Sequence, residues 1–67
     1  MPDPITRAKR YQRHAGECLE LAALATTEAT RREYENLTAA YLKLAEAELK
    51  LADEIEAHNE RAMKAQA

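Results

Sequence analysis

The chain has 67 residues and a mass of 7.6 kDa, which is enough for a single small domain covering residues 1–67. A domain this small usually needs a disulfide, a metal or a second chain to complete its core, and one cysteine excludes an internal disulfide. A net charge of −2 excludes a chain that is basic throughout, the class typical of nucleic-acid-binding domains. Abundant alanine and leucine, with one glycine and two prolines, predict an all-α protein.

The first predicted helix covers about residues 4–25. Asp3 can cap it by accepting a hydrogen bond from a free backbone N–H, and Pro4 suits the first helical position, which needs no donor. Gly16 costs a helix only about 1 kcal/mol, so it does not end this segment. It is either a bare surface glycine or a place where a second helix approaches closely.

A break is predicted at Thr26, with Thr27 as the cap of the next helix, because threonine is poor inside helices and good at their N-termini. Two alternatives stay open. Thr30 and Glu33 form a capping-box pattern that would start the second helix later. The turn also lacks glycine and proline, so a single unbroken helix is the other alternative.

The second predicted helix covers about residues 28–64 and contains no helix breaker. Its apolar positions alternate spacings of three and four, which is the heptad pattern of a coiled coil. The predicted contact line consists of Tyr34, Leu37, Tyr41, Leu44, Glu48, Leu51, Ile55 and His58, widened by Thr38, Ala45 and Ala52.

Two helices with a short connection predict an antiparallel hairpin. Its expected core is Tyr11, Ala15, Cys18, Ala22, Tyr34, Leu37, Tyr41 and Leu44. The second helix is longer, so its last turns should extend beyond the first. A further set of apolar residues would then lack cover, namely Leu19, Leu24, Leu42, Leu49, Leu51, Ile55 and Met63. We expect these to form an oligomer interface in a dimeric four-helix bundle.

The charges of the two helices are complementary. The basic block, defined as Arg7, Lys9, Arg10 and Arg13, stands near the start of the first helix, and six acidic residues with one lysine occupy positions 46–60. In an antiparallel hairpin the two groups are neighbours and should favour one register, although an exposed ion pair contributes only about 0–1 kcal/mol. Alternatively, the basic block contacts phosphates of nucleic acid or of an anionic surface.

Glu48 interrupts the predicted apolar line between Tyr41 and Ile55. A carboxylate there must be paired, hydrogen-bonded or protonated, and Arg7 is an expected neighbour. It either extends to solvent at the edge of the hairpin or sets register and oligomer state. A di-metal role would need Glu-x-x-His pairs, and Glu56-x-His58 has the wrong spacing.

We interpret the other reactive side chains as packing residues rather than as parts of a chemical site. His14 and Cys18 are four residues apart and could supply half of a metal site, but no matching pair exists in the second helix. Cys18 on the apolar side of its helix is expected to be buried. The three tyrosines could stack on bases, yet they fall on the predicted contact lines. No catalytic set is recognisable, so we predict no enzyme activity, no cofactor and no metal.

The pattern Tyr11-x-x-x-Ala15-x-x-Cys18-x-x-Leu21-Ala22, followed by Arg31, Leu37 and Tyr41-x-x-Leu44-Ala45, resembles a group of short bacterial proteins of unknown function, typical of alphaproteobacteria. The resemblance covers about residues 10–47 and rests mostly on hydrophobic spacing. Tyr41 stands where the group often has tryptophan, and Thr27 where it often has aspartate. The resemblance implies a bacterial helical hairpin and implies no activity.

Taken together, the residues predict a non-catalytic hairpin that self-associates, with a dimer favoured, and that docks onto a protein partner. The alternative is a small nucleic-acid or anionic-surface binder that uses the basic block. No apolar run approaches the ~20 residues of a membrane span, and no secretory signal is recognisable, so we expect a cytoplasmic protein.

Overall fold

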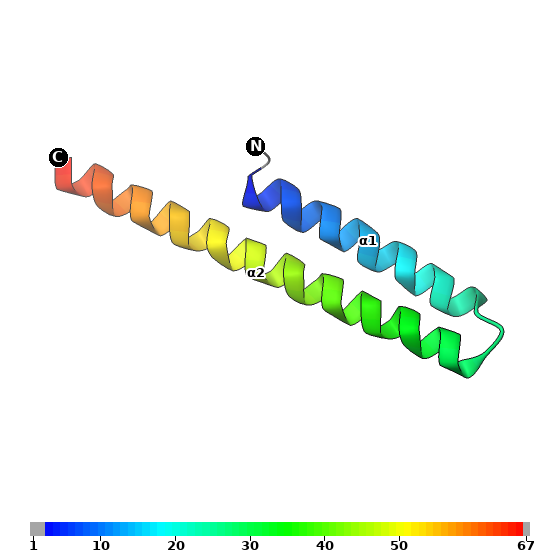
Figure 1. Cartoon of the computed structure of the whole chain (residues 1–67). Helices are drawn as coiled ribbons and strands as arrows, with labels where there is room; N and C mark the ends of the chain where they lie inside the picture. The colour runs from blue at the N-terminus through cyan, green and yellow to red at the C-terminus, as the bar shows by residue number, and fades with distance from the viewer. Residues whose placement is uncertain (1–2, 67) are drawn as a thin grey trace.

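The computed structural model describes residues 3–66 and shows two helices. Helix α1 (Pro4–Leu24) has 21 residues and helix α2 (Glu28–Gln66) has 39. They run antiparallel, joined by residues 25–27, and form a rod of 61 × 16 × 15 Å (Figure 1). The predicted all-α hairpin is confirmed, with helix bounds within two residues of those expected.

Side chains cap both helices as the sequence predicts. Asp3 Oδ1 accepts the backbone N–H of Thr6 at 2.7 Å, and this hydrogen bond holds the pKa of Asp3 below its ordinary value. Thr27 Oγ1 accepts the backbone N–H of Thr30 at 3.2 Å. The second helix therefore starts after Thr27 rather than at Thr30, and residues 25–27 exclude a single unbroken helix.

Small side chains make the contact between the helices. The buried residues of α1 are Ala8, Ala15, Cys18 and Ala22, and the most buried residue of α2 is Ala45. Ala8, Ala15 and Ala22 are spaced by seven, so they follow one line along the helix. Side chains of this size let two helix backbones approach closely.

The placement of the α2 leucines corrects the sequence-based core. Leu37 is 46% exposed and Leu44 45%, so neither belongs to the core of the hairpin. The contact line of α2 runs instead through Thr38, Ala45 and Ala52, the positions one residue later. Because alanines line the facing side of α1, small residues of α2 fit against it better than leucines do. Ala8 is a core residue that the sequence analysis missed.

Aromatic rings fill the middle of the contact. The Tyr11 and Tyr41 rings stack with centroids 6.2 Å apart, and the His14 ring lies 5.3 Å from that of Tyr41. Nearby, the Thr38 hydroxyl reaches the carbonyl oxygens of Tyr34 at 2.9 Å and Ala15 at 3.5 Å. Tyr11, Tyr34 and Tyr41 are half-buried, as expected for positions at the edge of a narrow core.

The last part of α2 extends beyond α1. Residues 53–64 of α2 are all exposed, and we call this segment the overhang. In Figure 1 it is the yellow-to-red part of α2, which has no second helix beside it. Neither helix in residues 3–66 combines the length and apolar character needed to cross a lipid bilayer.

Candidate interaction surface

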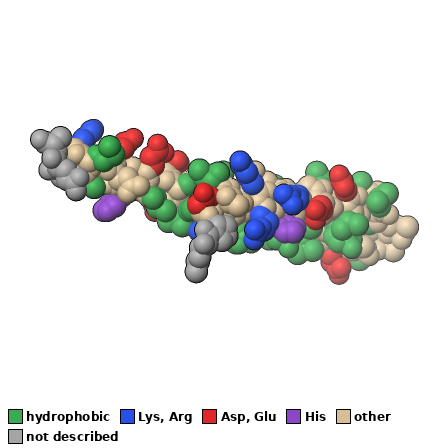
Figure 2. Space-filling view, turned by 90° about the horizontal axis from the view of Figure 1, so that it is seen from above, with side chains coloured by type: hydrophobic (Ala, Val, Ile, Leu, Met, Phe, Trp, Pro, Cys, Tyr) green, Lys and Arg blue, Asp and Glu red, His purple; other side chains and the backbone are tan. Residues whose placement is uncertain are grey.

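The large aliphatic side chains of this hairpin lie on its surface. Each of the eight leucines and both isoleucines is at least 40% exposed, and Leu24 and Met63 reach 77% and 72%. Figure 2 shows hydrophobic side chains along the length of the rod, interspersed with charged ones. Soluble monomers rarely expose so large a share of their apolar residues, so this arrangement is typical of an interaction surface.

The α2 leucines occupy two sides of the helix. Leu37, Leu44 and Leu51 are spaced by seven and precede the contact line by one residue; we call them the leucine stripe. Leu42 and Leu49 are also spaced by seven but lie on the other side of the contact line. One hairpin therefore presents two separate apolar sides.

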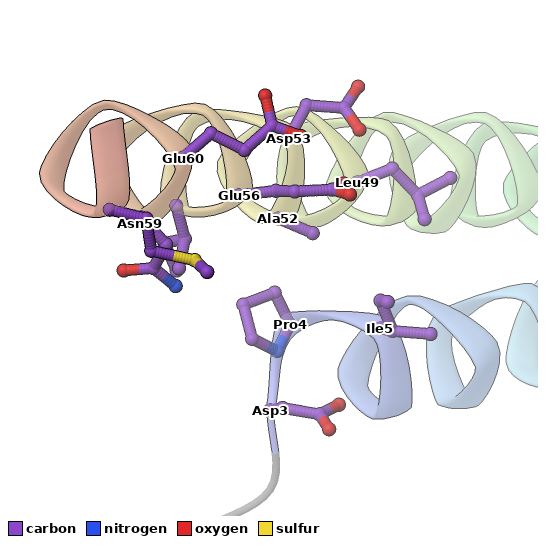
Figure 3. A pocket seen from close by; sticks show the side chains of 11 residues that line it. Asp3, Pro4, Ile5, Leu49, Ala52, Asp53, Glu56, Asn59 and Glu60 are labelled. Atoms are coloured by element: carbon purple, nitrogen blue, oxygen red, sulfur yellow. The ribbon is translucent and has the colours of Figure 1, made fainter. Parts of the chain in front are cut away.

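A hollow of about 820 Å³ lies at the step where α1 begins and the overhang continues. We call it the notch; Figure 3 shows Pro4 and Ile5 at the first turn of α1, across from residues of α2. Its apolar lining includes Ile5, Leu49, Ala52, Ile55 and Met63, and its acidic lining consists of Asp3, Asp53, Glu56 and Glu60, with Asn59 between. A notch of this composition fits an amphipathic helix with basic edges.

Glu48 forms an ion pair with Arg7, the neighbour expected from the sequence. Arg7 Nε donates to Glu48 Oε2 at 2.9 Å, and the two side chains keep 32% and 20% of their exposure. The pair joins the first turns of α1 to α2 at the mouth of the hairpin. It accounts for the carboxylate in the contact line, while its role in register or oligomer state stays a prediction.

The rest of the basic block is not compensated in the way the sequence suggested. Within residues 3–64, whose side chains the structure describes, Lys9, Arg10 and Arg13 are exposed and form no ion pair. The reason is geometric, because α1 begins level with Ala52 and most of the acidic residues of α2 lie in the overhang. Three basic side chains thus remain near the N-terminus of α1, where positive charge opposes the helix dipole.

The remaining residues singled out in the sequence do not converge on a chemical site. His14 Nδ1 lies 3.5 Å from Glu17 Oε2, His58 is in the overhang, and Gly16 has open space where a Cβ would be. In the described part of the chain, no group of three or more His, Cys, Asp or Glu side chains could hold a metal ion.

Cys18 is buried in the contact between the helices. We expect its thiol to react with a thiol reagent at least about tenfold more slowly in the native protein than in denaturant, since reaction requires local opening. The matched control carries Cys18→Ala and Ala23→Cys, which moves the thiol to an exposed position of the same helix. A native reaction rate equal to that of the control would contradict the packing described above.

Comparison with protein-family models, with curated proteins and with solved structures gives no match. The resemblance to short bacterial hairpins therefore stays a prediction.

Proposed function

We propose that this protein is a non-catalytic helical hairpin that works by associating with itself and with a protein partner. The observation that supports this most strongly is the inverted distribution of apolar residues. The core is alanine and one cysteine, whereas the leucines and isoleucines face outward. Burial of apolar surface stabilises a fold by about 25 cal/mol per Å². Because a core of small side chains buries little of this surface, further burial against another chain would stabilise the fold.

The two apolar sides of α2 suggest how both kinds of association occur on one chain. A second copy covers the side with Leu42 and Leu49, which continues into the notch. The leucine stripe on the other side then remains for a partner protein. Its spacing of seven, with Ala40 and Ala47 between the leucines, suits the apolar side of another helix.

The first test is the mass of the protein in solution. We expect a folded dimer at micromolar concentration by sedimentation equilibrium, and no steep loss of its stability as salt is raised, because the apolar part of the association is not weakened by salt. Leu42→Ser with Leu49→Ser should shift the protein toward monomer while helical content stays near that of the wild type.

The matched control is Lys43→Ser with Lys50→Ser, exposed positions one residue later with the same spacing. These changes should leave the mass unchanged. A folded 7.6 kDa monomer that persists at about 100 times the micromolar concentration of the first test would overturn the proposal.

The exposed basic block supports a second candidate function, binding to phosphates of nucleic acid or an anionic surface. Lys9, Arg10 and Arg13 lie within two turns of α1, and Figure 2 shows lysine and arginine side chains gathered near the middle of the rod. Such binding should weaken steeply as salt rises, unlike the apolar association. Fluorescence anisotropy with a labelled DNA duplex, measured at low and physiological salt, distinguishes the two.

A further inference from the structure

The notch and the start of α1 are complementary surfaces that a single chain cannot bring together. The notch offers Glu56 and Glu60 beside apolar side chains, but α1 of the same chain begins at the mouth of the notch and runs away from them. Lys9 and Arg13, in turn, are exposed and form no ion pair within the described residues. Each surface therefore has the charge that the other needs.

The two surfaces also match in spacing. Lys9, Arg13 and Gly16 follow one another at intervals of four and three along one side of α1. Glu56, Glu60 and Met63 follow at the same intervals along the overhang, and all three line the notch. Two parallel helices in this register place lysine beside glutamate and arginine beside glutamate.

The third position of this register joins the exposed Met63 side chain to Gly16. A Cβ added at Gly16 would meet nothing within its own hairpin, so the glycine leaves room for a side chain from outside. The same offset places Gln12 beside Asn59, and Asn59 is a polar residue of the notch. Charge, polarity and size therefore agree in one alignment.

We propose that the occupant of the notch is a second copy of this chain, whose first α1 turns lie parallel to the overhang with Lys9 beside Glu56 and Arg13 beside Glu60. This inference rests on the proposed self-association and specifies its geometry. In a two-fold dimer each copy offers one notch and one α1, so the contact occurs twice and the assembly is closed. The two α1 helices then lie head to head, and 21 residues from each nearly match the 39 of α2.

Charge opposes the alternative in which the overhang lies along the loop end of a second hairpin. That end carries Glu17, Glu20, Glu28, Glu33 and Glu35 against Arg31 and Arg32, so it would repel the acidic overhang. Like charges placed together across an interface disfavour that arrangement. The basic turns of α1 are the part of the chain that attracts the overhang.

Paired charge reversals test this geometry. One variant carries Lys9→Glu with Arg13→Glu, and the other carries Glu56→Lys with Glu60→Lys. Alone, each variant juxtaposes like charges at both contacts, and its dimer dissociation constant should rise on the order of tenfold to a hundredfold. Mixed in equal amounts, the two variants should form a heterodimer of near wild-type affinity, because both contacts again pair opposite charges.

Lys9, Arg13, Glu56 and Glu60 are all exposed, so their reversal removes no contact between α1 and α2 of the same chain. Circular dichroism should therefore show undiminished helix in both variants. The matched controls are Arg31→Glu with Arg32→Glu and Glu17→Lys with Glu20→Lys, which change the net charge equally at the loop end. They should dimerise within about threefold of the wild type, since only distant, screened charges change.

The possible outcomes separate this inference from the proposed function. Suppose that the wild type is a dimer. Dissociation constants unchanged in both reversed variants, or not restored when the variants are mixed, would then overturn the geometry and leave self-association intact. A wild-type monomer would overturn both. DNA binding that is lost with Lys9→Glu and Arg13→Glu, in a dimer of unchanged affinity, would assign these residues to phosphate contacts instead.

Discussion

Ala45→Leu should be among the most destabilising single substitutions in this chain. Ala45 is 2% exposed and lies between two fixed contacts of the helices, the Arg7–Glu48 ion pair and the hydrogen bond from Thr38 to Ala15. At this level of the rod it faces the part of α1 around Ala8, which is equally buried. A leucine there has no room unless the helices separate, and overpacking of this kind costs about 1–3 kcal/mol.

The loss of stability should approach or exceed the upper end of that range, because the two helices contact each other along a single line only. Urea unfolding followed by circular dichroism, at one fixed protein concentration, gives the change in free energy of unfolding. Ala39→Leu is the matched control on the exposed side of α2, and it should change stability by less than about 0.5 kcal/mol. Equal stability of the two variants would contradict an alanine-lined contact.

Local signals in the sequence were sufficient to predict the helices and their ends. Two local signals each specify a helix start within a few residues, through hydrogen bonding and backbone geometry. They are Asp3 with Pro4, and Thr27 directly after Thr26. The partner of Glu48 was also predictable, because an antiparallel hairpin with a short turn has only one register near its mouth. These features depend on neighbours in sequence or on simple counting from the turn.

The contact line of α2 was harder to predict because two adjacent heptad lines are both apolar. Hydrophobicity favours the leucine stripe, whereas the structure packs Thr38, Ala45 and Ala52 against α1. Periodicity gives the direction of an apolar side only to within about one residue. The signal that could have decided it lies on the other helix, where alanines spaced by seven indicate close approach.

The pairing of the basic block with the acidic residues of α2 was predicted incorrectly for a related reason. Opposite net charges of residues 7–13 and 46–60 suggested pairing within the hairpin, but only Arg7 and Glu48 pair between these blocks in the described part of the chain. The first turn of α1 lies level with Ala52, so Glu56 and Glu60 belong to the overhang, which extends past the start of α1. Composition shows the complementary charges, but the unequal lengths of the two helices leave most of them unpaired within one hairpin.

Replacing Glu48 by leucine should destabilise the hairpin, although it adds apolar area to the contact line. The substitution leaves the Arg7 guanidinium, which is 32% exposed, without its carboxylate. Breaking a fully buried pair costs about 3–5 kcal/mol, and the residual exposure of both side chains reduces the expected loss to about 1–2 kcal/mol. Glu46→Leu, an exposed position two residues earlier, should stay within about 0.5 kcal/mol of the wild type.

The double variant Arg7→Met with Glu48→Leu removes both charges and should recover the wild-type stability or exceed it, because apolar replacement of an ion pair is often neutral or stabilising by about 1–4 kcal/mol. Completing the cycle with Arg7→Met alone isolates the coupling between the two side chains from the other contacts of Arg7. If the pair also sets register, the stable double variant should form a broader set of assemblies in light scattering, since an all-apolar line tolerates slipped packings. A single mass equal to that of the wild type would restrict the pair to a stabilising role, and an unchanged melting curve for Glu48→Leu would remove even that.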